Sequence, residues 1–185
     1  MTSFLFAVCQ MSLMAYLVTF LFEDLGWSLV AAGAALTVAQ AGGVIGRILW
    51  GYVADRWLTP TVMLIVIALL LTVGAVGTAL LRPDSSPWIL FPVLVIFGAS
   101  AIGWNGVFLA QIARLAPVGQ ASVATGGTLC ITFLGVVLGP PLFGVLAGVF
   151  NSYGASYGVL GLFGLVITIM LVRLRSTSRA TSPQS

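Results

Sequence analysis

The sequence predicts an all-α, polytopic membrane protein with six membrane-spanning helices. Of its 185 residues, 60% are hydrophobic and 6% are charged, and the mean hydropathy is +1.17. A chain of this composition has too little polar surface to cover a water-soluble globule. Its apolar runs are each about 20 residues long, which lets a helix cross a hydrocarbon core of about 30 Å. Strands of a membrane barrel are half that length and alternate in polarity.

Hydropathy between polar breaks delimits the six helices, and short connections rich in Pro, Gly, Ser and Asp separate them. The expected ranges are 2–22, 29–53, 61–81, 88–110, 120–147 and 155–173. We therefore expect one six-helix bundle over residues 1–174 and a disordered basic tail over residues 175–185. Because the chain begins almost directly in its first helix, we also expect a truncated or half-length chain.

The arginines predict the orientation in the membrane, because cytoplasmic loops retain positive charge during insertion. With residue 1 inside, only Arg82 falls outside. The arginines at inside ends are Arg47, Arg56, Arg114, Arg173, Arg175 and Arg179. The prediction is a multi-pass protein of the plasma (bacterial inner) membrane, surrounded by the lipid bilayer, with both termini cytoplasmic.

A glycine pattern recurs at an offset of 93 residues. Gly26, Gly33, Gly42, Gly46 and Gly51 pair with Gly119, Gly126, Gly135, Gly139 and Gly144. The repeat unit contains three helices, and because three is odd, the two units run in opposite directions through the membrane. Residues of about 1–85 and 86–174 thus form an inverted repeat, an arrangement common in secondary transporters. The alternative is a chance alignment of two glycine-rich helices.

Charges in this apolar chain concentrate in GGVIGRILWGYVADRW, residues 42–57. Gly43, Arg47, Gly51 and Asp55 recur every four residues and therefore share one stripe of a helix. An arginine inside a spanning helix costs on the order of 3 kcal/mol and needs a partner or a water-filled cavity. Asp55, about 12 Å away along the axis, is one candidate partner and helix-end carbonyls are another. Alternatively, Arg47 only anchors the inner end of its helix.

Within that stretch, GRILWGYVADR resembles the signature that the major facilitator superfamily carries between helices two and three of each half. Gly51, Asp55 and Arg56 match it, with Gly46 and Arg47 as the upstream pair. Residues 58–60 replace the further glycine and basic pair of the signature, which is typical of the copy in the C-terminal half. The resemblance implies one half of a major facilitator fold, a 3+3 inverted repeat. It also implies a cytoplasmic gating motif whose charged contacts stabilise the outward-facing state.

The segment GGTLCITFLGVVLGPPLFG is similar to family sequences of the eleventh helix, including a GPP turn. Its expected packing and kink residues are Gly126, Gly135, Gly139, Pro140, Pro141 and Gly144. The spacing also resembles the antiporter motif of the fifth helix, with Phe143 where that motif has glycine. The short basic tail favours helices seven to twelve.

Polar residues near the middle of each helix are candidates to line a substrate path, which lies near mid-bilayer in such folds. They are Gln10, Tyr16, Gln40, Trp104, Asn105 and Thr128, with Ser12 and Thr132 as further candidates. Gln40 and Asn105 are favoured because amides are rarer in lipid than hydroxyls, and Trp104 offers a flat ring beside Asn105. For each one, a hydrogen bond between helices is the alternative.

The predicted function is transport of a small-molecule substrate by alternating access. Half a fold lacks one wall of the path, so the expected partner is a missing N-terminal six-helix half or a second copy. The alternative is an inactive fragment or a non-transporting membrane protein. We expect no enzyme activity, cofactor, metal or nucleic acid: the GASAIG stretch resembles intramembrane serine proteases, but the chain has no histidine. No Asp or Glu falls inside a predicted span, so a proton-coupling group would have to come from elsewhere.

Overall fold

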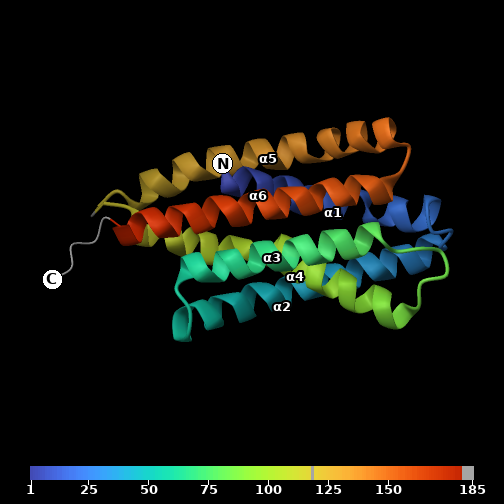
Figure 1. Cartoon of the computed structure of the whole chain (residues 1–185), viewed down its shortest axis with the longest axis horizontal. Coiled ribbons are helices and arrows are strands. Elements are labelled where there is room, and N and C mark those ends of the chain that lie inside the picture. The colour runs from blue at the N-terminus through green and yellow to red at the C-terminus, as the bar shows by residue number, and fades with distance from the viewer. Residues whose placement is uncertain (118, 181–185) are drawn as a thin grey trace.

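A computed structural model describes residues 1–117 and 119–180, with side chains as far as residue 176. The helices are α1 (Thr2–Glu23), α2 (Leu29–Arg56), α3 (Pro60–Ala79), α4 (Pro87–Leu115), α5 (Ala121–Phe150) and α6 (Tyr153–Ala180). Each is long and apolar enough to cross a membrane, so the six predicted spans are confirmed (Figure 1).

Several helices extend beyond the ends that hydropathy predicted. Glu23 ends α1, Asp55 and Arg56 form the last turn of α2, and Arg114 lies near the end of α4, although all were assigned to loops. The predicted tail is helical from residue 175 to Ala180, while residues 181–185 lie outside the described part of the chain. A helix satisfies its backbone internally and arginine is a good helix former, so a helix need not stop where the apolar run stops.

The second helix of each repeat packs mainly on the first helix of the other repeat. The main contact of α2 is with α4, the first helix of the second repeat, and the main contact of α5 is with α1. The third helices, α3 and α6, pack on each other and lie side by side between α2 and α5 (Figure 1). The two repeats therefore interlock instead of forming separate three-helix units.

Repeated glycines make these exchanged contacts close. A Cβ added to Gly46 would lie 2.7 Å from the carbonyl oxygen of Ala99 in α4. A Cβ on its repeat mate Gly139 would lie 3.0 Å from the Cα of Val8 in α1. The preceding pair, Gly42 and Gly135, meets backbone of α4 and α1 in the same way. In lipid, such backbone approach is a main source of helix association, so the shared glycines serve the same packing in both repeats.

The turns before α2 and α5 also correspond. Gly26 has a φ of 69° and Gly119 a φ of 81°, the left-handed region that glycine adopts without a Cβ penalty. The GPP turn predicted in α5 is wrong, because the helix continues from Ala121 through Pro140 and Pro141 to Phe150. Neighbouring helices and local adjustments stabilise proline inside membrane helices, which removes the need for a break.

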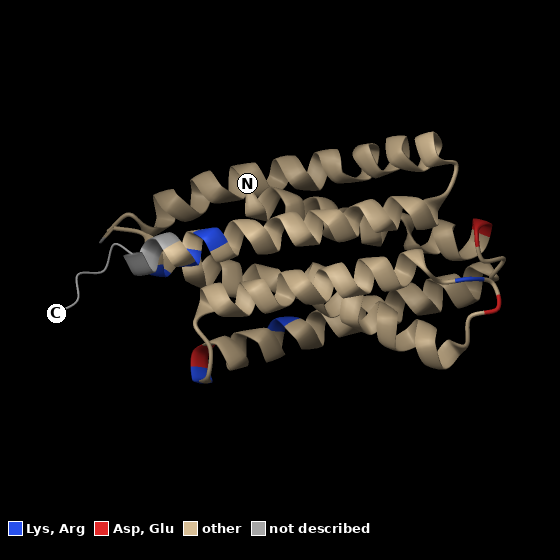
Figure 2. Ribbon diagram, in the orientation of Figure 1, with Lys and Arg blue, Asp and Glu red and all other residues tan. Residues whose placement is uncertain are grey.

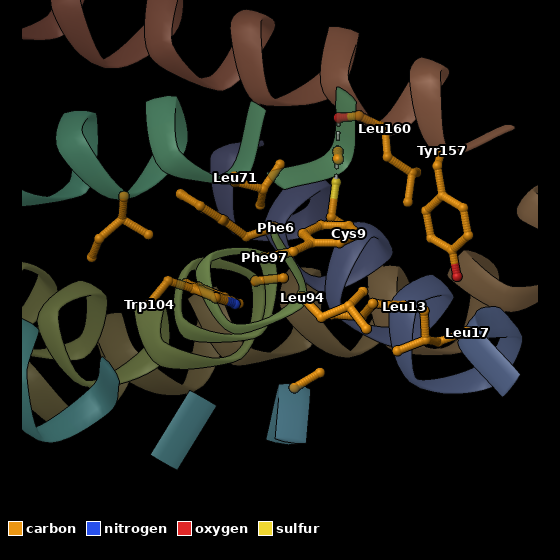
Figure 3. Packing of buried hydrophobic residues seen from close by; sticks show 14 of the residues in the cluster. Phe6, Cys9, Leu13, Leu17, Leu71, Leu94, Phe97, Trp104, Tyr157 and Leu160 are labelled. Atoms are coloured by element: carbon orange, nitrogen blue, oxygen red, sulfur yellow. Dashed lines mark hydrogen bonds between the residues drawn. The ribbon is translucent and has the colours of Figure 1, made fainter. Parts of the chain in front are cut away.

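The core lies around α1, which contacts α2, α4, α5 and α6. Phe6, Leu13 and Leu17 are fully buried, and the Cys9 thiol donates to the Leu160 carbonyl at 3.9 Å (Figure 3). Tyr157 is buried among aromatic rings of α1, α4 and α5, and its hydroxyl has no hydrogen-bond partner in the described structure. The centre of the bundle is therefore almost wholly apolar.

Apart from Arg47 inside α2, the charged residues lie toward the two ends of the bundle (Figure 2). Asp55, Arg56 and the arginines late in α4 and α6 lie at one end, whereas Glu23, Asp24, Arg82 and Asp84 lie at the other. We call the arginine-rich end the inner end, following the positive-inside rule. At the outer end, Asp24 accepts hydrogen bonds from the amides of Tyr153 and Gly154 at 3.1 and 3.3 Å, which caps α6.

Candidate functional site

Three of the predicted midplane residues meet in one polar cluster. The Oε1 atom of Gln10 in α1 accepts a hydrogen bond from Trp104 Nε1 at 3.1 Å and another from Asn105 Nδ2 at 3.2 Å, both in α4. Gln10 and Asn105 are only partly buried, unlike Trp104. We call these three residues the α1/α4 polar cluster.

Trp104 does not present its ring as predicted. Its side chain is 1% exposed, because the indole stacks on Phe6 with ring centroids 4.9 Å apart and also contacts Phe108 edge to face. An indole held between two rings orients Gln10 and supports the core instead of offering a free face. Phe6 was not singled out in the sequence, since one phenylalanine among 11 in an apolar chain gives no signal.

Arg47 lies on the exposed surface of α2 and packs on α4 at two glycines that flank Trp104 and Asn105 in sequence. Gly103 and Gly106 of α4 pack against it: a Cβ on Gly106 would lie 3.7 Å from Arg47 Cγ, and one on Gly103 would lie 3.0 Å from its backbone nitrogen. Gly106 is exposed and directly follows Asn105, so the arginine and the polar cluster border one surface. Gln40, two turns earlier on the same face of α2, is exposed as well.

Asp55 does not pair with Arg47. Its Oδ1 atom instead accepts from Arg114 Nη2 at 3.3 Å, which joins the inner ends of α2 and α4. Arg47 makes no ion pair with any described residue. The prediction failed because eight residues along one helix axis separate Arg47 from Asp55, while packing brings the end of α4 directly to Asp55. Both side chains of the pair are more than half exposed, so its net contribution is about 0–1 kcal/mol.

The remaining residues of the gating motif divide by role. Gly46 packs closely on α4, Gly51 has open space around it, and Arg56 is exposed at the end of α2. Sequence reasoning missed Trp50, whose indole Nε1 donates to the Ala99 carbonyl at 2.8 Å and fixes the same interface. The position of Trp50 between Gly46 and Gly51 of the charged stretch was the available signal.

Other predicted lining residues are not brought to the cluster. Tyr16 packs on Phe143 at 4.8 Å between ring centroids and on Tyr153, toward the outer end. Thr128 borders a cavity at the inner end. The hydroxyls of Ser12 and Thr132 donate to helix carbonyls. The Ser12 bond joins α1 to Gly139 of α5 and is the hydrogen bond between helices that the sequence left open, whereas Thr132 bonds to Thr128 within α5.

Residues of the predicted packing group in α5 also differ. Gly135 and Gly139 meet α1, and Gly144 lies against the Tyr16 hydroxyl, but Gly126 has nothing within 4 Å of an added Cβ. Pro141 is exposed and Pro140 is partly buried. Three glycines of this group therefore pack and one does not. Within the described residues, no group of three or more His, Cys, Asp or Glu side chains could hold a metal ion.

Comparison with known proteins identifies the family. The family model described as "Major Facilitator Superfamily" matches residues 1–131. The chain belongs to the major facilitator superfamily. Its fold is similar to that of the fucose:proton symporter FucP of Escherichia coli, with a TM-score of 0.77, 18% sequence identity, and coverage of 94% of this chain and 41% of the symporter. The bundle thus corresponds to one half of a major facilitator fold.

Curated relatives are transporters. "Monocarboxylate transporter 13" of Rattus norvegicus is 30% identical over 152 residues, which cover 82% of this chain and 35% of that protein. "Benzoate transport protein" of Acinetobacter baylyi is 32% identical over 158 residues, covering 82% and 32%. "Probable nitrate/nitrite transporter NarK2" of Mycobacterium tuberculosis is 29% identical over 192 residues, covering 99% and 45%. The chain thus matches 32–45% of the length of these relatives.

Proposed function

We propose that this chain is the C-terminal half of a secondary transporter that carries a small anion by alternating access. Family membership supports secondary transport in general. The anion class is supported by the names of the relatives, which are transporters for monocarboxylates, benzoate and nitrate or nitrite. Each of these substrates is negatively charged near neutral pH. No Asp or Glu of this chain lies near the middle of a span, which also favours an anion over a cation.

The position of Arg47 carries the proposal. Its side chain is exposed on the span α2 and packs beside Gly106, which directly follows Asn105 of the polar cluster in α4. An arginine at this depth requires a counter-charge or water, and no described carboxylate supplies one. A bound carboxylate or nitrate can accept two parallel hydrogen bonds from the guanidinium. Asn105 and Gln10 then supply neutral polar contacts at the same surface.

A complete path requires a second bundle opposite this surface. In transporters of this type, the substrate lies between two halves that rock about it. The second bundle is an N-terminal six-helix half or a second copy of this chain. The arginine-rich end would face the cytoplasm, with both termini inside and the bundle in the plasma membrane.

The inner end of α2 would act as the gate. Gly46 lets α2 lie close to α4, and Asp55 holds α4 through Arg114. Gly51, with open space beside it, and the exposed Arg56 remain available to a second bundle. A contact present in only one of two conformations biases the equilibrium between them. The gate residues and the α1/α4 polar cluster thus have separate roles in the proposed cycle.

Uptake into proteoliposomes tests the anion proposal. The purified chain, alone and together with any N-terminal half encoded with it, is assayed with radiolabelled benzoate, nitrate and neutral fucose. We expect Arg47→Gln to lower uptake of the transported anion by about tenfold or more, because a charge-assisted contact in a site of low polarity is lost. The matched control is Arg82→Gln, which removes the same charge at the outer end.

Two results would contradict the proposal. Equal anion uptake by Arg47→Gln and Arg82→Gln at matched protein content would exclude Arg47 as the anion contact. The second result is a folded wild-type chain whose proteoliposomes take up no more anion than empty liposomes, both alone and together with an N-terminal half. It would favour the alternative, a membrane protein without transport activity. Cross-linking in membranes separates a dimer of this chain from a monomer in the same samples.

A further inference from the structure

The inner end of the bundle contains a cavity that the proposed transport path does not use. Its volume is about 730 Å³, and it lies between the starts of α1, α3 and α5 and the ends of α4 and α6. Sites for small organic molecules commonly measure about 300–1,000 Å³. The cavity is therefore large enough for a ligand of that class.

The polar part of the cavity is basic. Arg114 from α4 and Arg175 from α6 both line it, together with the hydroxyls of Thr61 and Thr128. No carboxylate is among its described lining residues. Gln111 donates to Thr61 at 2.9 Å and thereby ties the α4 wall to the α3 wall. Two guanidinium groups without an acidic residue in the same lining favour an anionic ligand.

The part of the cavity that borders the buried core of the bundle is apolar. Leu64, Phe108 and Leu171 line it, and they are 2%, 7% and 5% exposed. The Phe108 ring packs edge to face on Trp104 with centroids 5.3 Å apart. Phe108 thus lines the cavity and contacts Trp104 of the α1/α4 polar cluster, whose three residues do not line the cavity. The cavity thus combines an apolar interior with a cationic rim.

We propose that this cavity binds an amphipathic anion. Its carboxylate or phosphate head contacts Arg114 and Arg175, and its apolar body lies among Leu64, Phe108 and Leu171. Two sources supply such a molecule: a free alkyl or aryl carboxylate from the aqueous phase, or an anionic phospholipid from the surrounding leaflet. Both present the same chemistry to the two arginines.

Arg114 links this cavity to the gate. The same guanidinium contacts Asp55 at 3.3 Å, so an anion in the cavity competes with Asp55 for it. Binding of the anion weakens the contact between α2 and α4, and loss of Asp55 strengthens anion binding. This competition makes the proposed site regulatory, whereas Arg47 and Asn105 belong to the transport path.

Direct binding to the purified full chain tests the site without any transport measurement. The protein is placed in nanodiscs of neutral phosphatidylcholine. Octanoate binding is measured by equilibrium dialysis, with neutral octanol as the matched ligand that lacks the charge. Phosphatidylglycerol binding is measured by native mass spectrometry in parallel. We expect saturable binding of about one anion per chain, and octanol to bind at least about fivefold more weakly.

Three substitutions and one control sharpen the test. Arg175→Gln and Arg114→Gln should each weaken anion binding by about fivefold or more, because a charge-assisted contact is lost. Asp55→Asn should tighten it about threefold, because Arg114 no longer has a competing carboxylate. Arg82→Gln, at the other end of the bundle, should leave it unchanged. Circular dichroism and a single gel-filtration peak establish that each variant is folded.

Each outcome decides the proposal. Binding of octanoate alone identifies a free anion, binding of phosphatidylglycerol alone identifies a lipid, and either result with the expected arginine dependence supports the site. Absence of saturable binding of both probes to the wild type overturns it, as does equal affinity for octanoate and octanol. Equal anion binding by Arg175→Gln and Arg82→Gln overturns it too. The binding assay and the uptake assay are independent, so the proposed role of Arg47 in transport can be wrong while anion binding in this cavity is right, and the reverse also holds.

Discussion

The helices α2 and α5 occupy equivalent places in the two repeats but differ in chemistry. Both pack against the first helix of the other repeat, and both do so through glycines at matching positions, Gly46 and Gly139 among them. At the positions of Arg47 and Asp55, however, α5 carries Pro140 and Gly148. Packing is therefore shared by the repeats, whereas charge belongs to one of them.

The partners of these helices differ as well. The helix α4 also contributes glycines to its contact with α2. Gly98 lies against the Ala39 backbone and Gly103 lies against Arg47. The helix α1, which receives α5, contains no glycine between Thr2 and Glu23. In the α2/α4 contact, both helices thus provide glycines at the interface, whereas in the α1/α5 contact only α5 does. The helix with the charges also has the tighter contact, which holds its side chains at fixed positions.

Gly98→Val tests the two-sided contact and should have the largest effect. A Cβ there collides with the carbonyl of Ala39, which is backbone and cannot rotate away. We expect a loss of about 3 kcal/mol or more in unfolding free energy, at the upper end of overpacking costs. The midpoint of SDS-induced unfolding in mixed micelles, followed by circular dichroism, measures it.

The control for this substitution is Gly126→Val, where an added Cβ meets nothing within 4 Å. It should change the free energy of unfolding by less than about 0.5 kcal/mol, as surface substitutions usually do. Similar destabilisation by both substitutions would mean that valine weakens the helices themselves and that the α2/α4 contact is not close.

Gly135→Ala tests the one-sided contact and should cost less, about 1–2 kcal/mol. The neighbour is the Phe4 carbonyl near the start of α1, where a helix end can shift to make room. The same unfolding assay measures it, with Gly33→Ala as the control in open space. For a matched comparison, Gly98→Ala is measured in the same assay. A larger loss of unfolding free energy for Gly135→Ala than for Gly98→Ala would mean that the α1/α5 contact is the closer one.

Asp24→Ala should cost about 1 kcal/mol, because it removes the side-chain cap of α6. Asp24 is paired in the repeat with Pro117, so the second repeat has no corresponding cap. Asp84→Ala removes a carboxylate at the same end that takes no part in this cap, and it should be nearly neutral. Unfolding free energies that are equal for Asp24→Ala and wild type would show that the cap contributes nothing.

Asp55→Asn should have the smallest effect on stability, below about 1 kcal/mol, since the pair with Arg114 is exposed. Its effect on the proposed transport should still be visible as uptake slowed about twofold to fivefold, with a shift toward the inward-open state. Uptake equal to wild type at matched expression would remove this pair from the gate.

Much of the fold was predictable because a membrane imposes it. A span needs about 20 apolar residues, so hydropathy located all six helices. A hydrogen bond between helices was also foreseen for Gln10 and Asn105 as one of two alternatives, since an amide in a span requires a partner, and their place in a substrate path stays a prediction. The ion pair of Asp55 with Arg114 was not predictable, because the two residues are 59 positions apart in the sequence and only the packing of α2 on α4 brings them together.

Counting to the middle of a helix also misplaced Thr128 and misjudged Trp104. A count gives depth along one axis, but it gives neither the rotation of that helix nor its shift against its neighbours. Thr128 therefore borders the inner cavity, and Trp104 lies between Phe6 and Phe108 in the core. The helix ends were misjudged for a related reason, because hydropathy reports the hydrocarbon boundary and not the last hydrogen-bonded turn.

The exchange of partners between the repeats has a consequence for biosynthesis. When α1 and α2 enter the bilayer, the helices that form their main contacts, α5 and α4, have not yet been made. The glycine face of α2 stays open to lipid until α4 is inserted, and α1 waits longer still for α5. The glycine contacts that join the two repeats therefore form late and in reverse order of synthesis, α2 with α4 first and α1 with α5 afterwards.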